Sequence, residues 1–202
     1  PSDRSTDTGT CAGDDRHPFV EPAHVNVLLV SQRVIVARGG RYSQGNVMSL
    51  DSTVALVTGA QQGIGAATAE VLAERGATVV INYLDDEAAA AAVQARIEAR
   101  GGQAVTVPGD VANPTDVANM VEVAESMGGI NLLVNNAGIF PRVEFLEMTE
   151  DDWDCVFAVN LRAMFLCAQA AAKRMVSAGR AGAIINLTSS AAHSGPPLGV
   201  HY

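Results

Sequence analysis

Short apolar runs alternate with amphipathic helical stripes along the chain from residue 50 onward. The sequence predicts strands at residues 53–58, 78–83, 104–107, 131–135 and 183–188, and helices at 63–75, 85–100, 114–127 and 149–177. Nearly uninterrupted apolar strands are typical of a sheet that is buried on both faces. Because strand–helix–strand units close by right-handed crossovers, we expect an α/β fold built on one doubly wound parallel sheet.

The composition fits such a fold and narrows the function. Hydrophobic residues make up 48% of the chain, enough for a packed core. The net charge of −9 argues against nucleic-acid binding, which needs a basic face. No uninterrupted apolar run reaches the roughly eighteen residues of a membrane helix, so no membrane span is expected.

The three cysteines, Cys11, Cys155 and Cys167, are an odd number without the spacing of metal ligands. This pattern argues against a disulfide framework and predicts no metal site. It also favours a reducing compartment, so we expect a cytoplasmic protein.

The first 49 residues differ in charge from the rest. They carry five basic and five acidic side chains, whereas residues 50–202 carry eight basic and seventeen acidic ones. Two short strands are conceivable at 25–30 and 34–37, without a clear packing partner. We interpret residues 1–49 as a disordered or non-native leader, with Met48 as the native start. A targeting peptide is the alternative, which the acidic residues disfavour.

A glycine-rich loop joins the first expected strand to the first expected helix. Glycines at this place let the backbone turn tightly and approach a pyrophosphate, which then lies on the positive helix N-terminus. The residues expected to bind a dinucleotide here are Gly59, Gln62, Gly63, Ile64 and Gly65. A ligand-free tight turn remains the alternative. With the alternating elements, the loop predicts a Rossmann-type single domain.

The residue that contacts the adenosine ribose lies about 20 residues after the glycine loop in such domains. Here that position is Tyr83, eighteen residues after Gly65. An aspartate would select NAD(H) because it repels a 2′-phosphate, so the tyrosine favours NADP(H) slightly over NAD(H). Asp85 and Asp86 stand nearby and would reverse this preference if they faced the ribose, although a helix-capping role is the stronger interpretation.

Further motifs follow in order along the chain. The third expected strand is followed by Gly109-Asp110-Val111, and the fourth is followed by Asn135-Asn136-Ala137-Gly138. Asn160 lies in the long expected helix. The last two motifs are residues 184–190 at the fifth strand and Tyr202 at the end of the chain. With the glycine loop, these motifs resemble the short-chain dehydrogenase/reductase family over residues 52–202. The residues of these motifs are most similar to those of 3-oxoacyl-acyl-carrier-protein reductases and glucose-dehydrogenase-like members of the family.

The resemblance implies an oxidoreductase that moves a hydride between NAD(P)(H) and a carbonyl or alcohol substrate. Tyr202 would be the acid/base, Ser190 would orient the substrate oxygen, and Asn160 would hold a proton-relay water. Ser189 is the alternative serine, because it lies thirteen residues before Tyr202 as in the family. Asn135 would brace the central strands. Further cofactor contacts are implied from Asp110, Val111, Asn136, Ala137 and Gly138.

The family also places a lysine four residues after the tyrosine, where its charge favours the phenolate of a side chain whose ordinary pKa is near 10. This chain ends at Tyr202, so we interpret it as C-terminally incomplete. The expected partners are a small-molecule carbonyl or alcohol and further copies of the chain, in a dimer or tetramer. The alternative function is an inactive nucleotide-binding fragment.

Overall fold

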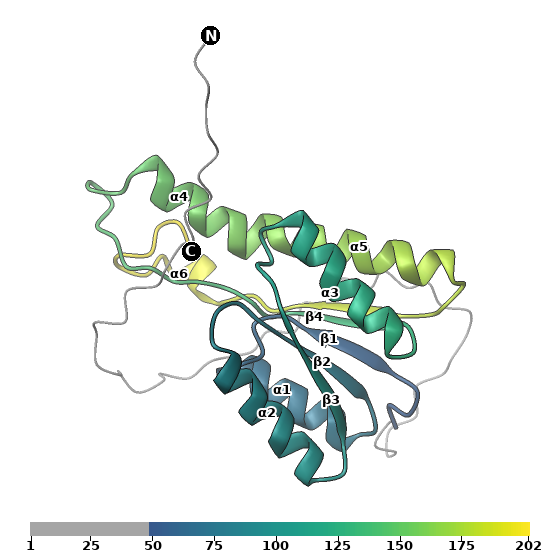
Figure 1. Cartoon of the computed structure of the whole chain (residues 1–202). Coiled ribbons are helices and arrows are strands. Elements are labelled where there is room, and N and C mark those ends of the chain that lie inside the picture. The colour runs from purple at the N-terminus through teal and green to yellow at the C-terminus, as the bar shows by residue number, and fades with distance from the viewer. Residues whose placement is uncertain (1–48) are drawn as a thin grey trace.

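The computed structural model of the 202-residue chain describes residues 49–202 (Figure 1). The leader interpretation of residues 1–47, the native start at Met48, the conceivable strands at 25–30 and 34–37, and Cys11 all lie outside the described residues. The fold below therefore concerns the segment that carries every motif of the sequence.

Strands and helices alternate as the apolar pattern predicts. The elements are β1 (Val54–Val57), α1 (Gly63–Glu74), β2 (Thr78–Tyr83), α2 (Glu87–Ala99), β3 (Gln103–Pro108), α3 (Pro114–Ser126), β4 (Leu132–Asn135), α4 (Glu150–Phe157), η1 (Ala158–Arg162), α5 (Ala163–Ser177), β5 (Ala183–Asn186) and α6 (Ala191–Ser194). The five strands form one parallel sheet in the order β3-β2-β1-β4-β5. The predicted α/β doubly wound fold is confirmed.

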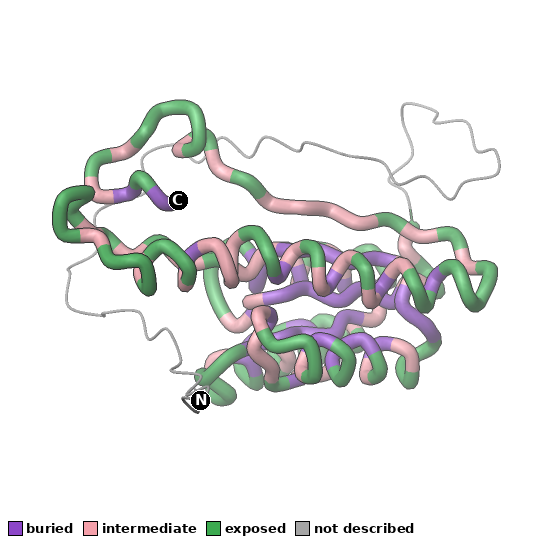
Figure 2. Tube along the Cα trace, turned by 90° about the horizontal axis from the view of Figure 1, so that it is seen from above, coloured by how far each residue is buried: buried purple, intermediate pink, exposed green. Residues whose placement is uncertain are grey.

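Helices cover both faces of the sheet, as Figure 1 shows: α1 and α2 on one side, α3 and α5 on the other. Alternate strand residues supply the two cores. Leu56, Val80 and Leu133 belong to the core beneath α3 and α5, while Val57 and Ile81 belong to the core beneath α1 and α2. In Figure 2 the buried residues accordingly run through the middle of the molecule. The strand order reverses at β1 and β4, the place where open α/β sheets bind ligands.

The helix starts follow the capping chemistry of the sequence. The Asn113 side chain accepts the Thr115 N–H at the start of α3, and Asp86 accepts the Ala89 N–H at the start of α2. Thr149 and Asp152 form a reciprocal capping box at α4. Hydrogen bonds from Thr149 hold the pKa of the exposed Asp152 carboxyl below its ordinary value.

The expected helix over 149–177 is one helical segment, in which a π-helical turn, η1, joins α4 to α5. Among the described residues, this segment is long and apolar enough to cross a membrane by length and composition alone, a test that the core helix of a soluble protein also passes. Its buried side chains, Ala163, Cys167, Ala171 and Met175, pack into the core beneath it. The segment thus contributes one face to a sheet core.

The two cysteines of this segment differ. Cys167 is a free, buried thiol, and burial raises its pKa to about 12. Cys155, in α4, is only partly buried.

The sheet core makes a direct prediction about stability. Leu133 in β4 is fully buried, so Leu133→Ala removes apolar contacts and leaves a cavity. We expect the free energy of unfolding to fall by about 2–5 kcal/mol, measured by urea denaturation. Leu146→Ala, at a side chain that is 94% exposed, is the matched control and should change it by less than about 0.5 kcal/mol. Equal effects of the two substitutions would contradict the proposed core.

Candidate functional site

The hydroxyl of Thr58, directly after β1, joins the loops that follow β1 and β4. It accepts the backbone N–H groups of Asn136 and Ala137, each at 3.0 Å, and donates to the Val134 carbonyl at 3.4 Å. A hydroxyl has one donor and two acceptor positions, so this one is saturated. The Asn136 side chain completes the junction by donating to the carbonyls of Thr58 at 2.8 Å and Gly59 at 3.0 Å.

Two glycines are required because these loops touch. A Cβ on Gly59, whose φ is +60°, would lie 2.9 Å from the Cα of Ala137. A Cβ on Gly65 would lie 2.5 Å from the Asn136 amide nitrogen and 2.6 Å from the Gly59 carbonyl oxygen. Such distances are not compatible with a side chain. Gly59 and Gly65 therefore permit the loop-to-loop contact itself.

Gln62, Gly63 and Ile64 of the glycine loop face open space. Nothing would lie within 4 Å of a Cβ on Gly63, Gln62 is exposed, and Ile64 is 45% exposed. Gln62 gives no side-chain cap to α1, and the first turn of α1 carries no acidic residue. The first backbone N–H groups of α1 are thus available to an anion at the positive end of the helix dipole.

A buried asparagine that sequence reasoning missed links a third loop to this site. The Asn82 side chain, 1% exposed, accepts the Gly59 N–H at 3.1 Å and donates to the Gly109 carbonyl at 2.9 Å. It thereby connects the segments that follow β1 and β3 through β2. Its signal in the sequence is a polar residue inside an otherwise apolar strand.

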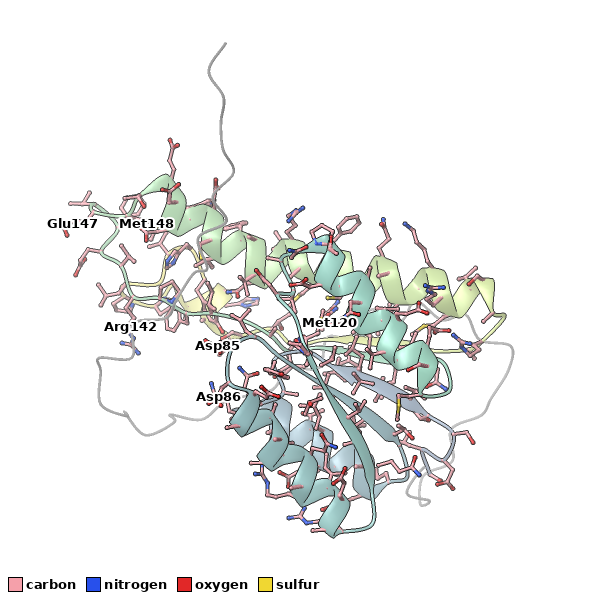
Figure 3. All side chains as sticks on the ribbon, in the orientation of Figure 1. Asp85, Asp86, Met120, Arg142, Glu147 and Met148 are labelled. Carbon is pink, nitrogen blue, oxygen red and sulfur yellow. The ribbon has the colours of Figure 1, made fainter. Side chains whose placement is uncertain are left out.

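The residues expected to contact adenosine lie at the ends of β2 and β3. Tyr83 is buried and belongs to the core beneath α1 and α2. Asp110 accepts the Ala112 N–H at 2.8 Å, and Val111 is buried. Figure 3 labels Asp85 and Asp86 between β2 and α2; both are exposed, and only Asp86 caps the helix.

Asn160 lies in the π-helical turn η1, and its amide makes two hydrogen bonds to the backbone of Ile139. Its Oδ1 accepts the Ile139 N–H and its Nδ2 donates to the Ile139 carbonyl, both at 2.8 Å. The side chain therefore fixes the backbone after Gly138. The expected brace by Asn135 is also present, because its Nδ2 donates to the Asn186 Oδ1 at 2.8 Å and joins β4 to β5.

The candidate catalytic hydroxyls lie after β5. The Ser189 hydroxyl accepts the Ala191 N–H at 3.1 Å, which leaves Ser190 as the exposed serine of the pair. Within residues 49–202, no hydrogen bond joins the Ser190 hydroxyl to Tyr202. Tyr202 is 38% exposed, and its ring packs on Phe140, with the ring centroids 4.4 Å apart.

The side chain of His201, the residue before Tyr202, is buried. Only 4% of it is exposed, and neither ring nitrogen has a hydrogen-bond partner among the described residues. A second buried polar atom without a partner in this part of the chain is Oε1 of Gln61, in the glycine loop. Spacing along the sequence gives no signal for either, because burial here depends on segments that meet only in the fold.

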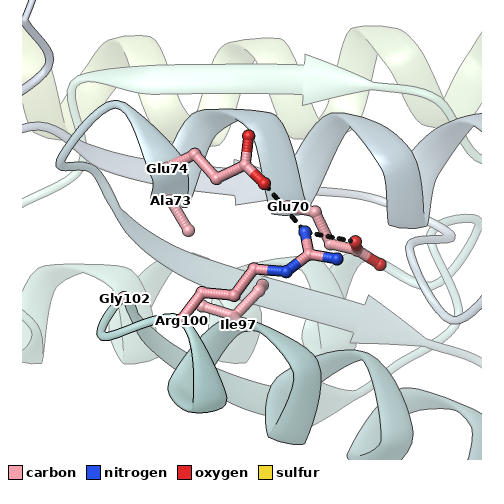
Figure 4. A pocket seen from close by; sticks show the side chains of 6 residues that line it. All are labelled: Glu70, Ala73, Glu74, Ile97, Arg100 and Gly102. Atoms are coloured by element: carbon pink, nitrogen blue, oxygen red, sulfur yellow. Dashed lines mark hydrogen bonds and ion pairs between the residues drawn. The ribbon is translucent and has the colours of Figure 1, made fainter.

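Two pockets lie away from the glycine loop. One, drawn in Figure 4, lies between α1 and α2, where Arg100 pairs with Glu70 at 3.1 Å and with Glu74 at 2.8 Å. Exposed ion pairs of this kind add little stability. The other is open and borders the start of α4, with Phe145, Met148 and Trp153 in its lining. Among residues 49–202, no three His, Cys, Asp or Glu side chains are grouped to hold a metal ion.

A family model described as short chain dehydrogenase matches residues 53–202. The chain is similar to a 3-oxoacyl-acyl-carrier-protein reductase of Synechocystis sp., with 43% identity over 155 residues, 76% of this chain and 62% of the relative. An L-rhamnose 1-dehydrogenase (NAD(P)(+)) of Sphingomonas sp. is 41% identical over 154 residues, 76% of this chain and 61% of the relative. The chain thus spans about three fifths of the length of these relatives.

Solved structures give the same relationship. A putative short-chain alcohol dehydrogenase of Sinorhizobium meliloti matches with a TM-score of 0.72 and 39% identity, covering 76% of this chain and 61% of that one. A short chain dehydrogenase of Burkholderia cenocepacia, in complex with NADP, matches with a TM-score of 0.61 and 44% identity, covering 63% and 52%. Both the resemblance read from the motifs and the fold are confirmed.

The saturated hydroxyl of Thr58 predicts a clear difference between two substitutions. Thr58→Val keeps the shape but leaves the N–H groups of Asn136 and Ala137 without their acceptor. We expect the free energy of unfolding to fall by about 1–3 kcal/mol, measured by urea denaturation. Thr58→Ser retains the hydroxyl and loses one methyl group, so it should cost about 0.8 kcal/mol. A serine variant less stable than the valine variant would refute this role of the hydroxyl.

Proposed function

Because the chain belongs to the short-chain dehydrogenase family, whose model matches residues 53–202, we propose that it transfers a hydride between NAD(P)(H) and a small carbonyl or alcohol substrate. The observation that carries the proposal is the glycine loop, fixed by Thr58 and Asn136 at the uncapped start of α1. A diphosphate fits this place, because backbone N–H groups and the helix dipole both favour negative charge there.

The residues present fit a bound dinucleotide. Gly63 leaves open space beside the first turn of α1, and Ile64 is partly exposed there. We assign the pyrophosphate to the segment Gly59–Gly65 with Gln62, the adenosine to Asp110 and Val111, and the nicotinamide side to Asn136, Ala137 and Gly138. When bound, the nicotinamide would supply the hydride chemistry. The residues of the chain bind it, orient the substrate and exchange the proton.

Tyr202 is the group we assign to proton exchange with the substrate oxygen. Its side chain is partly exposed at the loop after β5, so substrate can reach it. Ser190 donates to the same oxygen and orients it, because Ser190 is the more exposed serine of the pair; Ser189 is the alternative, since its O–H is also free to donate. Proton transfer by such a positioned group contributes about 10²–10⁴-fold to a rate.

We assign Asn160 a positioning role in addition to the relay-water role that the resemblance implied. Its amide makes two hydrogen bonds to Ile139 and keeps one N–H and one lone pair for a water. The two bonds fix the loop that carries the nicotinamide-side residues on one end and Phe140 on the other.

The cofactor preference is NADP(H) slightly over NAD(H). Tyr83 brings no carboxylate to the end of β2, and the Asp86 carboxylate is engaged in capping α2. A relative of known structure, the Burkholderia cenocepacia dehydrogenase, was solved with NADP. Asp85 is the one exposed acid that opposes this preference, because its charge would repel a 2′-phosphate.

The assembly and location belong to the same proposal. Leu161, Phe165 and Val176 are each about 60% exposed along the segment 150–177, and an exposed apolar stripe is typical of a protein–protein interface. We propose that the stripe is covered in a homodimer or homotetramer. A cytoplasmic location, as expected for an acidic enzyme of this family, completes the proposal.

The first functional prediction concerns Tyr202 in the full-length protein. Tyr202→Phe removes the proton donor but keeps the ring, so kcat should fall by about 10²–10⁴-fold. The dissociation constant of NADPH, from fluorescence titration, should stay within about twofold. Tyr83→Phe, in the core, is the control and should retain turnover. A fully active Tyr202→Phe enzyme would refute the acid/base role, whereas cofactor binding by an unsubstituted protein without turnover would support the alternative of an inactive nucleotide-binding protein.

The second functional prediction concerns Asp85. Asp85→Asn removes one negative charge beside the expected 2′-phosphate, so NADPH should bind about three- to tenfold more tightly. NADH binding should change by less than about twofold. Glu98→Gln, near the far end of α2, is the control for net charge. If Asp85→Asn and Glu98→Gln change NADPH affinity equally, Asp85 does not face the phosphate.

A further inference from the structure

Phe140 is the aromatic neighbour of the proposed acid/base. Its ring centroid lies 4.4 Å from that of Tyr202, and the two ring planes are tilted by 40°. Tilted and offset contacts at this distance are the arrangement that aromatic pairs prefer. Phe140 comes from the loop after β4 and Tyr202 from the segment after β5, so the contact joins two loops at the same edge of the sheet.

The segment that carries Tyr202 is packed on Phe140 through Gly199 as well. A Cβ on Gly199 would lie 2.4 Å from one edge carbon of the Phe140 ring, and Gly199 is buried. The Tyr202 N–H donates to the Gly199 carbonyl at 3.1 Å, and the Val143 N–H donates to the Leu198 carbonyl at 3.0 Å. The two loops therefore form one packed unit around the Phe140 ring.

The backbone that bears Phe140 is fixed from the opposite side. Both hydrogen bonds of the Asn160 amide go to Ile139, the residue immediately before it. The Phe140 ring is thus held between the π-helical turn η1, through Ile139, and the turn that ends in Tyr202. A ring held at both ends determines where the Tyr202 ring lies.

Part of Phe140 is exposed to solvent. Phe140 and Tyr202 are each 38% exposed, so an apolar ring borders the open side of the phenol. Figure 3 labels Arg142 on the same loop, and its guanidinium lies 5.6 Å from the Phe140 ring centroid. A ring offers apolar contact to an aryl or alkyl group but no hydrogen bond to a hydroxyl, whose burial without a partner is costly.

We propose that Phe140 positions the Tyr202 ring and forms the apolar wall of the substrate subsite, which selects ketones or aldehydes with an aryl or alkyl substituent over polyhydroxylated sugars. The proposal rests on the proposed function, because the wall acts on a substrate whose oxygen is held at Tyr202. It assigns Phe140 two separable tasks, which two experiments on the full-length protein address.

The wall is tested by substrate selectivity. Phe140→Ala should raise the KM for benzaldehyde or acetophenone about tenfold, within the range that loss of apolar contact in a pocket produces. The KM for acetaldehyde, which is too small to reach the wall, should change by less than about twofold. Phe145→Ala, at a 64% exposed phenylalanine of the same loop, is the matched control and should leave both values unchanged. An equal change for all substrates would overturn the wall.

The positioning task is tested by exchanging size across the Phe140–Gly199 contact. Gly199→Ala places a methyl group into the ring, so kcat should fall about tenfold for every substrate. Phe140→Ala removes the ring that positions Tyr202, so it should by itself lower kcat about tenfold for every substrate. Adding Gly199→Ala to Phe140→Ala should lower kcat by less than about twofold more, because the ring that the methyl group meets is gone. Thermal unfolding shows that each variant is folded. An unchanged kcat in Phe140→Ala, or a full further tenfold loss in the double variant, would overturn the positioning role.

The outcomes separate the inference from the function on which it rests. Full activity of Tyr202→Phe, or no turnover of any carbonyl by the unsubstituted enzyme, overturns both. Inactivity of Tyr202→Phe together with unchanged KM values in Phe140→Ala overturns the wall alone. A ratio of kcat/KM for benzaldehyde to that for acetaldehyde that falls about tenfold in Phe140→Ala supports it.

Discussion

The hydroxyl of Thr58 is the junction on which the proposed cofactor site depends. It accepts two backbone N–H groups of the loop after β4 and donates to a carbonyl of β4, at the point where the strand order reverses. This close contact is why the glycine loop cannot carry side chains at Gly59 and Gly65. Gly59 and Gly65 are therefore required by contacts within the protein itself, independently of any ligand.

The loop after β4 connects the two halves of the proposed site. Its first residues, Asn136 and Ala137, are held by Thr58 on the cofactor side. Its next residues, Ile139 and Phe140, are held by Asn160 and packed on Tyr202 on the proton-transfer side. One short segment thus sets the distance between the place proposed for hydride transfer and the group proposed for proton exchange.

The sequence predicted the order and type of the elements because buried parallel strands, capped helices and glycine turns each leave a local pattern. The caps at Asn113 and Thr149 are examples. It did not reveal the buried network of Asn82, the burial of Tyr83 and His201, or the contact between Phe140 and Tyr202. Each of these depends on residues that are far apart in the chain and have no shared period.

The long helical segment also has features that its sequence shows and features that only the fold shows. Hydropathy and length place residues 150–177 in the range of a membrane helix, whereas the fold buries Ala163, Cys167 and Ala171 of that segment against the sheet. The π-helical turn contains Asn160, whose side chain is hydrogen-bonded to Ile139, and this turn leaves no periodic signal in the sequence.

What the sequence by itself determined is the family, the α/β architecture and the identity of the candidate groups, because these follow from local patterns and motif order. Only the tertiary structure decided which contacts those groups make. It engaged Asn160 and Ser189 in hydrogen bonds, placed Tyr83 in the core, and set Phe140 beside Tyr202. The physical reason is that hydrogen-bond partners and burial are properties of loops brought together at one edge of the sheet.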